Sequence, residues 1–156
     1  DETAERFKPC LHSLPKMAST ELAVWSGDQV MKDEEGYLYF ISRNDEMIKT
    51  SGYRVSPTEI EDIIHGTGLV TEAVAMGLPH AALGQAILLV VTPALGAKVD
   101  DALKNAVLSR CRRELPNFMV PAMVTVQDTL PHNSNGKIDR RMLCEQYKTM
   151  FQDDSP

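Results

Sequence analysis

The segment that most strongly constrains the interpretation of this chain reads LPHNSNGKIDR, residues 130–140. Its Asn-Gly pair at positions 135 and 136 favours a tight turn, because both residue types tolerate a positive φ. Lys137 follows the pair directly, and Arg140 stands three residues later. By itself, the pattern indicates an exposed loop that leads into a helix, with a lysine near its tip.

Two further segments stand upstream of this loop. One reads SRNDEMIKTSGYRV (residues 42–55), and the other is SGD at positions 26–28. In this order and spacing, the three segments resemble the C-terminal signatures of the AMP-forming acyl-CoA synthetases, a superfamily that includes adenylation domains and firefly luciferase. The run 51–59 is most similar to bacterial acyl-CoA ligases, among them the subgroup associated with exosortase systems. The resemblance extends from Ser26 to Leu143.

Composition sets limits that do not depend on the resemblance. With 156 residues, 43% of them hydrophobic, the chain can bury one substantial core. Its longest apolar run, residues 86–91, is too short to span a bilayer and no leader opens the chain, so a cytoplasmic location is expected. A net charge of −6 disfavours a nucleic-acid binder. Scattered cysteines, and histidines without i, i+4 spacing, predict neither disulfides nor a protein-held metal.

The order of elements predicts an α+β fold. Apolar runs bounded by Gly or Pro predict a small mixed sheet of about three strands, at residues 70–78, 85–92 and 120–126. Helices are expected to flank this sheet at 57–65, 100–115 and 139–150. A β-hairpin around an acidic turn at 33–36 should precede them, a second extended pair should flank Thr50-Ser51-Gly52, and the first twenty residues should form a surface connection.

The first expected helix has specific boundary signals. Ser56 and Glu59 fit a capping box around Pro57, which suits the first helical position. Gly66 is expected to end the helix in the left-handed conformation.

The resemblance implies two parts of a longer, mobile enzyme. Residues 1–44 would be the terminal segment of a large N-terminal adenylation domain, and residues 45–150 the mobile C-terminal domain, with a tail at 151–156. Asp45 would be the pivot between them. The phosphate loop and the acyl pocket of the family would lie upstream, so the isolated chain is expected to be inactive.

In such enzymes a carboxylic acid and Mg-ATP first give acyl-AMP and pyrophosphate. Asp28 and Arg43 match the residues that contact the ATP ribose, where a carboxylate offers two acceptors and a guanidinium a fork of donors. Lys137 matches the lysine that bridges the reacting carboxylate and the α-phosphate, where an ammonium stabilises the charged transition state. Without the resemblance, these three would be interpreted as a turn aspartate, a surface arginine and an exposed lysine.

The small domain of the family then rotates, and the CoA thiol displaces AMP. Lys49, Ser51, Gly52 and Arg54 match residues of this second state. Lys49 would approach the adenylate, Arg54 would meet a phosphate, and Gly52 would let its backbone lie close to the thiol tunnel. Alternatively, Gly52 is only a turn residue and Arg54 a strand-edge charge. ATP with Mg²⁺ and CoA are therefore expected as substrates, with no permanently bound cofactor.

The expected partners are the N-terminal domain in cis, the acid, ATP and CoA, and a lysine acyltransferase that would act on Lys137. Two other functions stay open at this point. An adenylation domain that loads a carrier-protein thiol would share all three motifs. A non-enzymatic module that binds a nucleotide or CoA belongs to a different class and would show affinity without the large domain.

Overall fold

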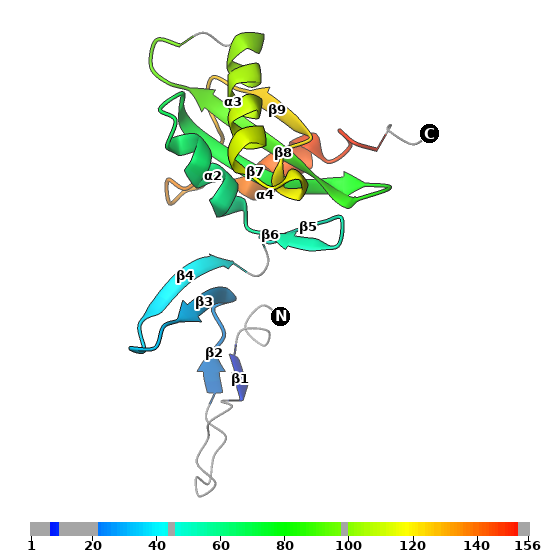
Figure 1. Ribbon diagram of the computed structural model, residues 1–156. Coiled ribbons are helices and arrows are strands. Elements are labelled where there is room, and N and C mark those ends of the chain that lie inside the picture. The colour runs from blue at the N-terminus through cyan, green and yellow to red at the C-terminus, as the bar shows by residue number, and fades with distance from the viewer. Residues whose placement is uncertain (1–6, 10–21, 44–45, 98–99, 153–156) are drawn as a thin grey trace, which may run out of the picture. The chain divides into compact units, whose positions relative to one another are not determined.

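The computed structural model describes residues 7–9, 22–43, 46–97 and 100–152 (Figure 1). The chain divides into two compact units, one that ends at Asp45 and one that begins at Glu46. Within the described residues, the first unit contains two small two-stranded sheets and the second a five-stranded sheet with helices.

The first unit is built from antiparallel strand pairs. β1 (Phe7–Pro9) pairs with β2 (Leu22–Val24), and β3 (Asp28–Lys32) pairs with β4 (Leu38–Arg43). The β3–β4 turn is closed by Asp33, whose carboxylate accepts the Tyr37 N–H at 2.9 Å. The expected hairpin is confirmed. The β1–β2 pair was not expected, because three-residue strands are too short to show alternation in the sequence.

The second unit contains a mixed sheet. Its strands are β5 (Ile48–Thr50), β6 (Tyr53–Val55), β7 (Val70–His80), β8 (Gly84–Pro93) and β9 (Met123–Val126). β7 and β8 form a long antiparallel hairpin, and β9 runs parallel to β8. β5 joins β8 at the pair Thr50–Gly84 and leads into β6. The three expected strands are present, and the extended pair around Thr50-Ser51-Gly52 enlarges their sheet.

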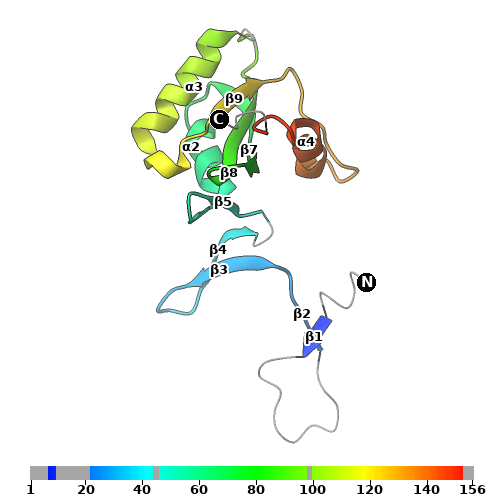
Figure 2. The same ribbon diagram turned by 90° about the vertical axis from the view of Figure 1, so that its right-hand side faces the viewer.

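Helices cover both faces of this sheet (Figure 2). α2 (Pro57–His65) and α3 (Asp101–Glu114) lie on one face, and α4 (Arg140–Tyr147) lies on the other. Successive strand residues point to opposite faces, so Ala75 and Leu89 pack towards α2 and α3, whereas Met76 and Leu88 pack towards α4. Because both faces are covered, β7 and β8 are apolar along most of their length.

The ends of α2 differ from the expected capping geometry. The helix starts at Pro57, but the Ser56 side chain makes no capping bond and its buried hydroxyl oxygen has no hydrogen-bond partner. Gly66 is right-handed, with φ −62°, and the left-handed conformation appears at Gly68, with φ 69°. Thr67 continues the helix end by one residue, because both its backbone N–H, at 3.1 Å, and its hydroxyl, at 2.6 Å, donate to the Ile64 carbonyl.

Later boundaries also shift. α3 begins at Asp101, one residue later than expected, because Asp100 caps the helix by accepting the Leu103 N–H at 3.0 Å. β9 begins only at Met123, after a 3₁₀ helix at Asn117–Met119 and after Pro121, which lacks a backbone donor. Phe151, in the expected tail, is buried in the α4-side core. Within the described part of the chain, no helix combines the length and the hydrophobicity that crossing a bilayer requires.

Candidate functional site

The loop between β9 and α4 presents Lys137. Asn133 organises it, because its carboxamide oxygen accepts the N–H groups of Asn135 at 2.9 Å and Lys137 at 3.1 Å. The Asn133 N–H donates in turn to the Lys137 carbonyl at 2.7 Å. Gly136 takes φ 74°, which a glycine adopts at no steric cost. The Lys137 backbone is therefore fixed, while its side chain is exposed.

The two arms of this loop are joined at its base. His132 and Ile138 form an isolated antiparallel bridge, and the Asp139 N–H donates to the Pro131 carbonyl at 2.7 Å. The Asp139 carboxylate also caps α4 by accepting the Met142 N–H at 2.9 Å. On the sheet side, His132 Nε2 lies 2.8 Å from the Glu72 carboxylate of β7. The loop is thus attached to both the sheet and α4.

The β5–β6 hairpin holds the second group of expected residues. Its two-residue turn is Ser51-Gly52, with φ values of 51° and 82°, as a type I′ turn requires. Ser51 is the only non-glycine residue with positive φ among those described. Lys49 and Arg54 stand opposite each other in the register, so two exposed cations share one face of the hairpin.

Contacts from two other segments hold this hairpin in place. The Gln85 carboxamide oxygen accepts the Lys49 N–H at 2.6 Å, and the Leu83 carbonyl accepts the Ser51 N–H at 2.9 Å. On β6, the Tyr53 ring stacks on Phe118 with a centroid distance of 4.1 Å. The hairpin is therefore attached to β8 and to the 3₁₀ helix at Asn117–Met119.

Gly52 has a conformational role within this unit. A Cβ built on Gly52 would meet no atom within 4 Å, so no described neighbour excludes a side chain there. What requires glycine is the φ of 82°, which L residues rarely adopt. The close approach expected for a thiol tunnel stays a prediction.

The two residues expected to contact the ribose lie on the paired strands of the first unit. The β3–β4 register places Asp28 directly opposite Arg43. The Asp28 N–H also donates to the Ser26 hydroxyl at 3.3 Å. The expected pivot, Asp45, lies outside the described residues. No group of three or more His, Cys, Asp or Glu side chains that could hold a metal occurs in the described ranges.

Several supporting residues were not identified from the sequence. Asn133 carried a usable signal, since an Asn two residues before an Asn-Gly pair is typical of a side-chain-closed turn. Gln85 carried none, because its partner Lys49 is 36 positions away. The same holds for Glu61, which bonds to Ala75 and Arg140, 14 and 79 positions away.

Comparison with known proteins matches this geometry to a family. The family model described as "AMP-binding enzyme C-terminal domain" matches residues 59–137, from α2 to the exposed lysine. A long-chain-fatty-acid–CoA ligase of Salmonella typhimurium is 38% identical over 121 residues, which is 78% of this chain and 21% of the relative. An acetyl-coenzyme A synthetase of Stutzerimonas stutzeri is 35% identical over 119 residues, 76% of this chain and 18% of the relative.

A solved structure agrees with the sequence comparisons. ATP-bound MatB from Rhodopseudomonas palustris superposes with a TM-score of 0.78 and 29% identity, over 97% of this chain and 27% of that one. The chain spans about a fifth of the length of the curated relatives that it matches. The expected α+β class and the expected resemblance are both confirmed. The chain belongs to the family of AMP-binding enzyme C-terminal domains.

Proposed function

We propose that this chain is the C-terminal part of an ATP-dependent, AMP-forming acyl-CoA ligase. Lys137 would serve acyl-AMP formation. After the C-terminal domain turns about Asp45, the hairpin with Lys49, Ser51, Gly52 and Arg54 would serve thioester formation. ATP with Mg²⁺, a carboxylic acid and CoA would be the substrates.

The observation that carries this proposal is the separation of the two groups onto two elements of one unit. Lys137 lies in the β9–α4 loop, and the other four residues lie in the β5–β6 hairpin, at an edge of the sheet. Each element ends in a turn held by specific hydrogen bonds. A domain that takes part in two successive half-reactions needs a separate group of residues for each step. The β9–α4 loop would provide the first group, and the β5–β6 hairpin would provide the second.

The first unit supports the proposal in a different way. Its β3–β4 ribbon exposes large apolar side chains of Val30, Met31, Leu38, Tyr39 and Phe40. Neighbouring residues point to opposite faces, so both faces of the ribbon are apolar. A two-stranded ribbon of this kind is marginal in water, and such a patch indicates a covered surface. We assign residues 1–44 to a large adenylation domain, with Asp28 and Arg43 at its ribose site.

The acid is proposed only as a carboxylic acid. Relatives that match at similar identity include a long-chain-fatty-acid–CoA ligase and an acetyl-coenzyme A synthetase. Similar identity to both therefore indicates no chain length for the acid of this protein.

The proposal is tested by separating the half-reactions in the full-length enzyme. Lys137→Ala should depress acyl-AMP formation by about 10²-fold, the scale for losing one well-placed electrostatic group. Supplied with preformed acyl-AMP, the same variant should convert CoA to thioester at close to the wild-type rate. Pyrophosphate exchange measures the first step, and thioester release measures the second.

Lys104→Ala is the control, because the Lys104 side chain is 43% exposed and belongs to α3, a different element from either turn. It should leave both half-reactions unchanged. Equal losses of both half-reactions in Lys137→Ala would contradict the proposed division of labour. Transfer to a carrier-protein thiol in place of CoA would favour the carrier-loading function instead.

A further inference from the structure

The free edge of β7 carries an ionic clamp. β7 lies at one end of the strand order, with β8 on its other side. At this edge, the Ala75 N–H donates to Glu61 Oε1 at 2.7 Å, and the Ala75 carbonyl accepts from Arg140 Nη1 at 3.0 Å. The two side chains thus satisfy both backbone groups of one residue, as a further strand would.

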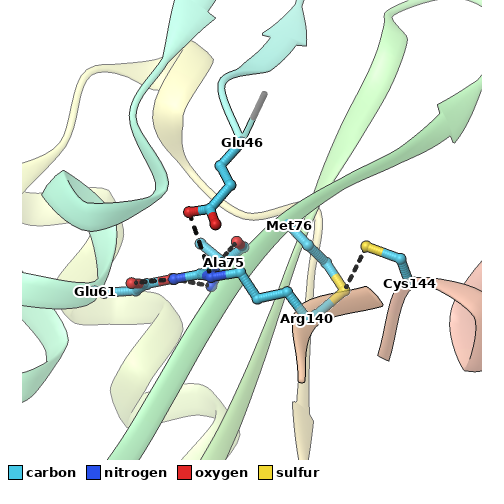
Figure 3. Close-up of polar contacts among 6 residues, drawn as sticks. All are labelled: Glu46, Glu61, Ala75, Met76, Arg140 and Cys144. Carbon is cyan, nitrogen blue, oxygen red and sulfur yellow. Dashed lines mark hydrogen bonds and ion pairs between the residues drawn. The ribbon is translucent and has the colours of Figure 1, made fainter. Parts of the chain in front are cut away.

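The clamp is closed by an ion pair. Arg140 Nη2 donates to Glu61 Oε2 at 2.8 Å, while Arg140 Nε lies 3.7 Å from Glu46 Oε2 (Figure 3). Glu61 is 8% exposed and the Arg140 side chain 27%. Glu61 comes from α2 on one face of the sheet, and Arg140 is the first residue of α4 on the other. The guanidinium therefore joins the two faces around the strand edge.

This clamp lies at the base of the Lys137 loop. Arg140 follows Lys137 by three residues, and Asp139 between them is bonded to Pro131 on the opposite arm. That arm is tied to β7 separately, through His132 and Glu72. Both arms are therefore fixed to the same strand, three residues apart, at Glu72 and Ala75.

We propose that Arg140 is a positioning residue that sets where Lys137 stands during acyl-AMP formation. The inference depends on the proposed function, because it assigns Arg140 a part in the step served by Lys137. The clamp uses three guanidinium nitrogens on three acceptors in different elements. A lysine ammonium lacks this planar fork, so Arg140→Lys cannot reproduce it.

The test compares Arg140→Gln and Arg140→Lys with Arg141→Gln in the full-length enzyme. Arg141 is the matched control, because it is the next residue of α4 and its side chain is exposed. Both Arg140 variants should lose roughly 10-fold to 100-fold in kcat for acyl-AMP formation, the scale of a small misplacement of a catalytic group. Thioester formation from preformed acyl-AMP should stay within about twofold of wild type, as should both steps in Arg141→Gln.

A double-mutant cycle distinguishes a positioning role of Arg140 from a purely structural role. In a Lys137→Ala background, Arg140→Gln should cause little further loss of acyl-AMP formation, because the group that it positions is already gone. Full additivity, or equal loss of both half-reactions in Arg140→Gln, would overturn the proposal. Thermal unfolding of each variant shows whether it is folded.

Glu61→Gln provides a second route if Arg140→Gln fails to fold. It retains an acceptor for the Ala75 N–H but loses the charge that faces Arg140. A loss confined to acyl-AMP formation supports the proposal, and a loss in both steps contradicts it. If Lys137→Ala itself leaves acyl-AMP formation intact, the proposed function fails. If Lys137→Ala abolishes this step and Arg140→Gln spares it, only the positioning role fails.

Discussion

The backbone of Lys137 is held by hydrogen bonds, whereas its side chain is exposed to solvent. Asn133 bonds to both the N–H and the carbonyl of Lys137, and the side chain extends from this anchored point into solvent. A fixed Cα with an exposed side chain can reach a substrate on a separate domain. The same exposure gives a modifying enzyme access to the amine.

Acylation of Lys137 should silence acyl-AMP formation, because it removes the positive charge while leaving the loop bonds intact. We propose a lysine acyltransferase as a partner on this basis. The measurement is pyrophosphate exchange by the full-length enzyme after acetylation, with the modified sites mapped by mass spectrometry. Normal exchange at stoichiometric Lys137 modification would exclude this mode of regulation.

The burial of Cys111 should make the stability of the chain depend on pH. Its thiol lies in the core beneath α3, and burial raises its pKa to about 11 from the ordinary value of 9.0. As pH rises, the Cys111 thiol loses its proton in the unfolded chain before it does so in the folded chain. Its contribution to the free energy of unfolding is therefore fully present below about pH 9 and is lost between pH 9 and 11. The slope should reach about 1 kcal/mol per pH unit in the middle of this window.

Urea unfolding of the chain at pH 8 to 11 checks this, with Cys111→Ala as the reference. The variant should be less stable at pH 8, because it leaves a small cavity, but its stability should fall less steeply above pH 9. Parallel curves for the two proteins would contradict the assignment to Cys111.

Among the elements, the β5–β6 hairpin and the β9–α4 loop use different turn chemistry for the same purpose. The hairpin depends on positive φ at two successive residues, whereas the loop depends on an Asn side chain and one glycine. Both turns hold an exposed cationic group on a rigid base. Substitutions in either turn will combine a conformational effect with any effect on substrate.

Gly52→Leu should impair thioester formation more than acyl-AMP formation in the full-length enzyme. The leucine side chain would extend from the hairpin that is proposed to lie close to the incoming CoA thiol. Gly96→Leu is a matched control, since Gly96 has φ 84° and, like Gly52, open space around its Cβ position. Both variants should lose similar stability, about 1–2 kcal/mol from left-handed strain. If Gly96→Leu causes the same kinetic loss as Gly52→Leu, backbone strain and not obstruction explains the result.

At the scale of the whole molecule, the two units differ in how much of their apolar surface they bury. The unit from Glu46 buries two apolar layers, one beneath α2 and α3 and one beneath α4. The β3–β4 ribbon of the other unit exposes its large apolar side chains. The second unit therefore has a core of its own, and the ribbon depends on other residues for cover.

The isolated chain should consequently fold over residues 46–152 and yet show no ATP–pyrophosphate exchange with any acid. The groups that would position ATP and the acyl group are proposed to lie elsewhere, and a lysine without them provides no proximity. Circular dichroism and an exchange assay with a panel of acids test both statements. Exchange that Lys137→Ala abolishes would mean that this chain is a complete catalyst.

The sequence by itself predicted many of the features that depend on neighbouring residues. The helix start at Pro57, the β7 and β8 strands and the Asn-Gly turn before Lys137 all follow from local periodicity and turn chemistry. The ordered motifs around Asp28, Lys49 and Lys137 were sufficient to indicate the family. Local rules were less successful at helix ends, where Thr67 satisfied a carbonyl and the left-handed residue moved to Gly68.

Only the tertiary structure decided which distant residues support the site. Whether Glu61 faces solvent or the edge of β7 depends on how α2 packs, and Arg140 reaches it across 79 positions of sequence. Gln85 and Lys49 meet because β5 adds to β8, a pairing that spacing along the chain does not encode. Local propensities act over a few residues, whereas these contacts form only when apolar burial has brought sheet and helices together, and this burial decides which polar groups need a partner.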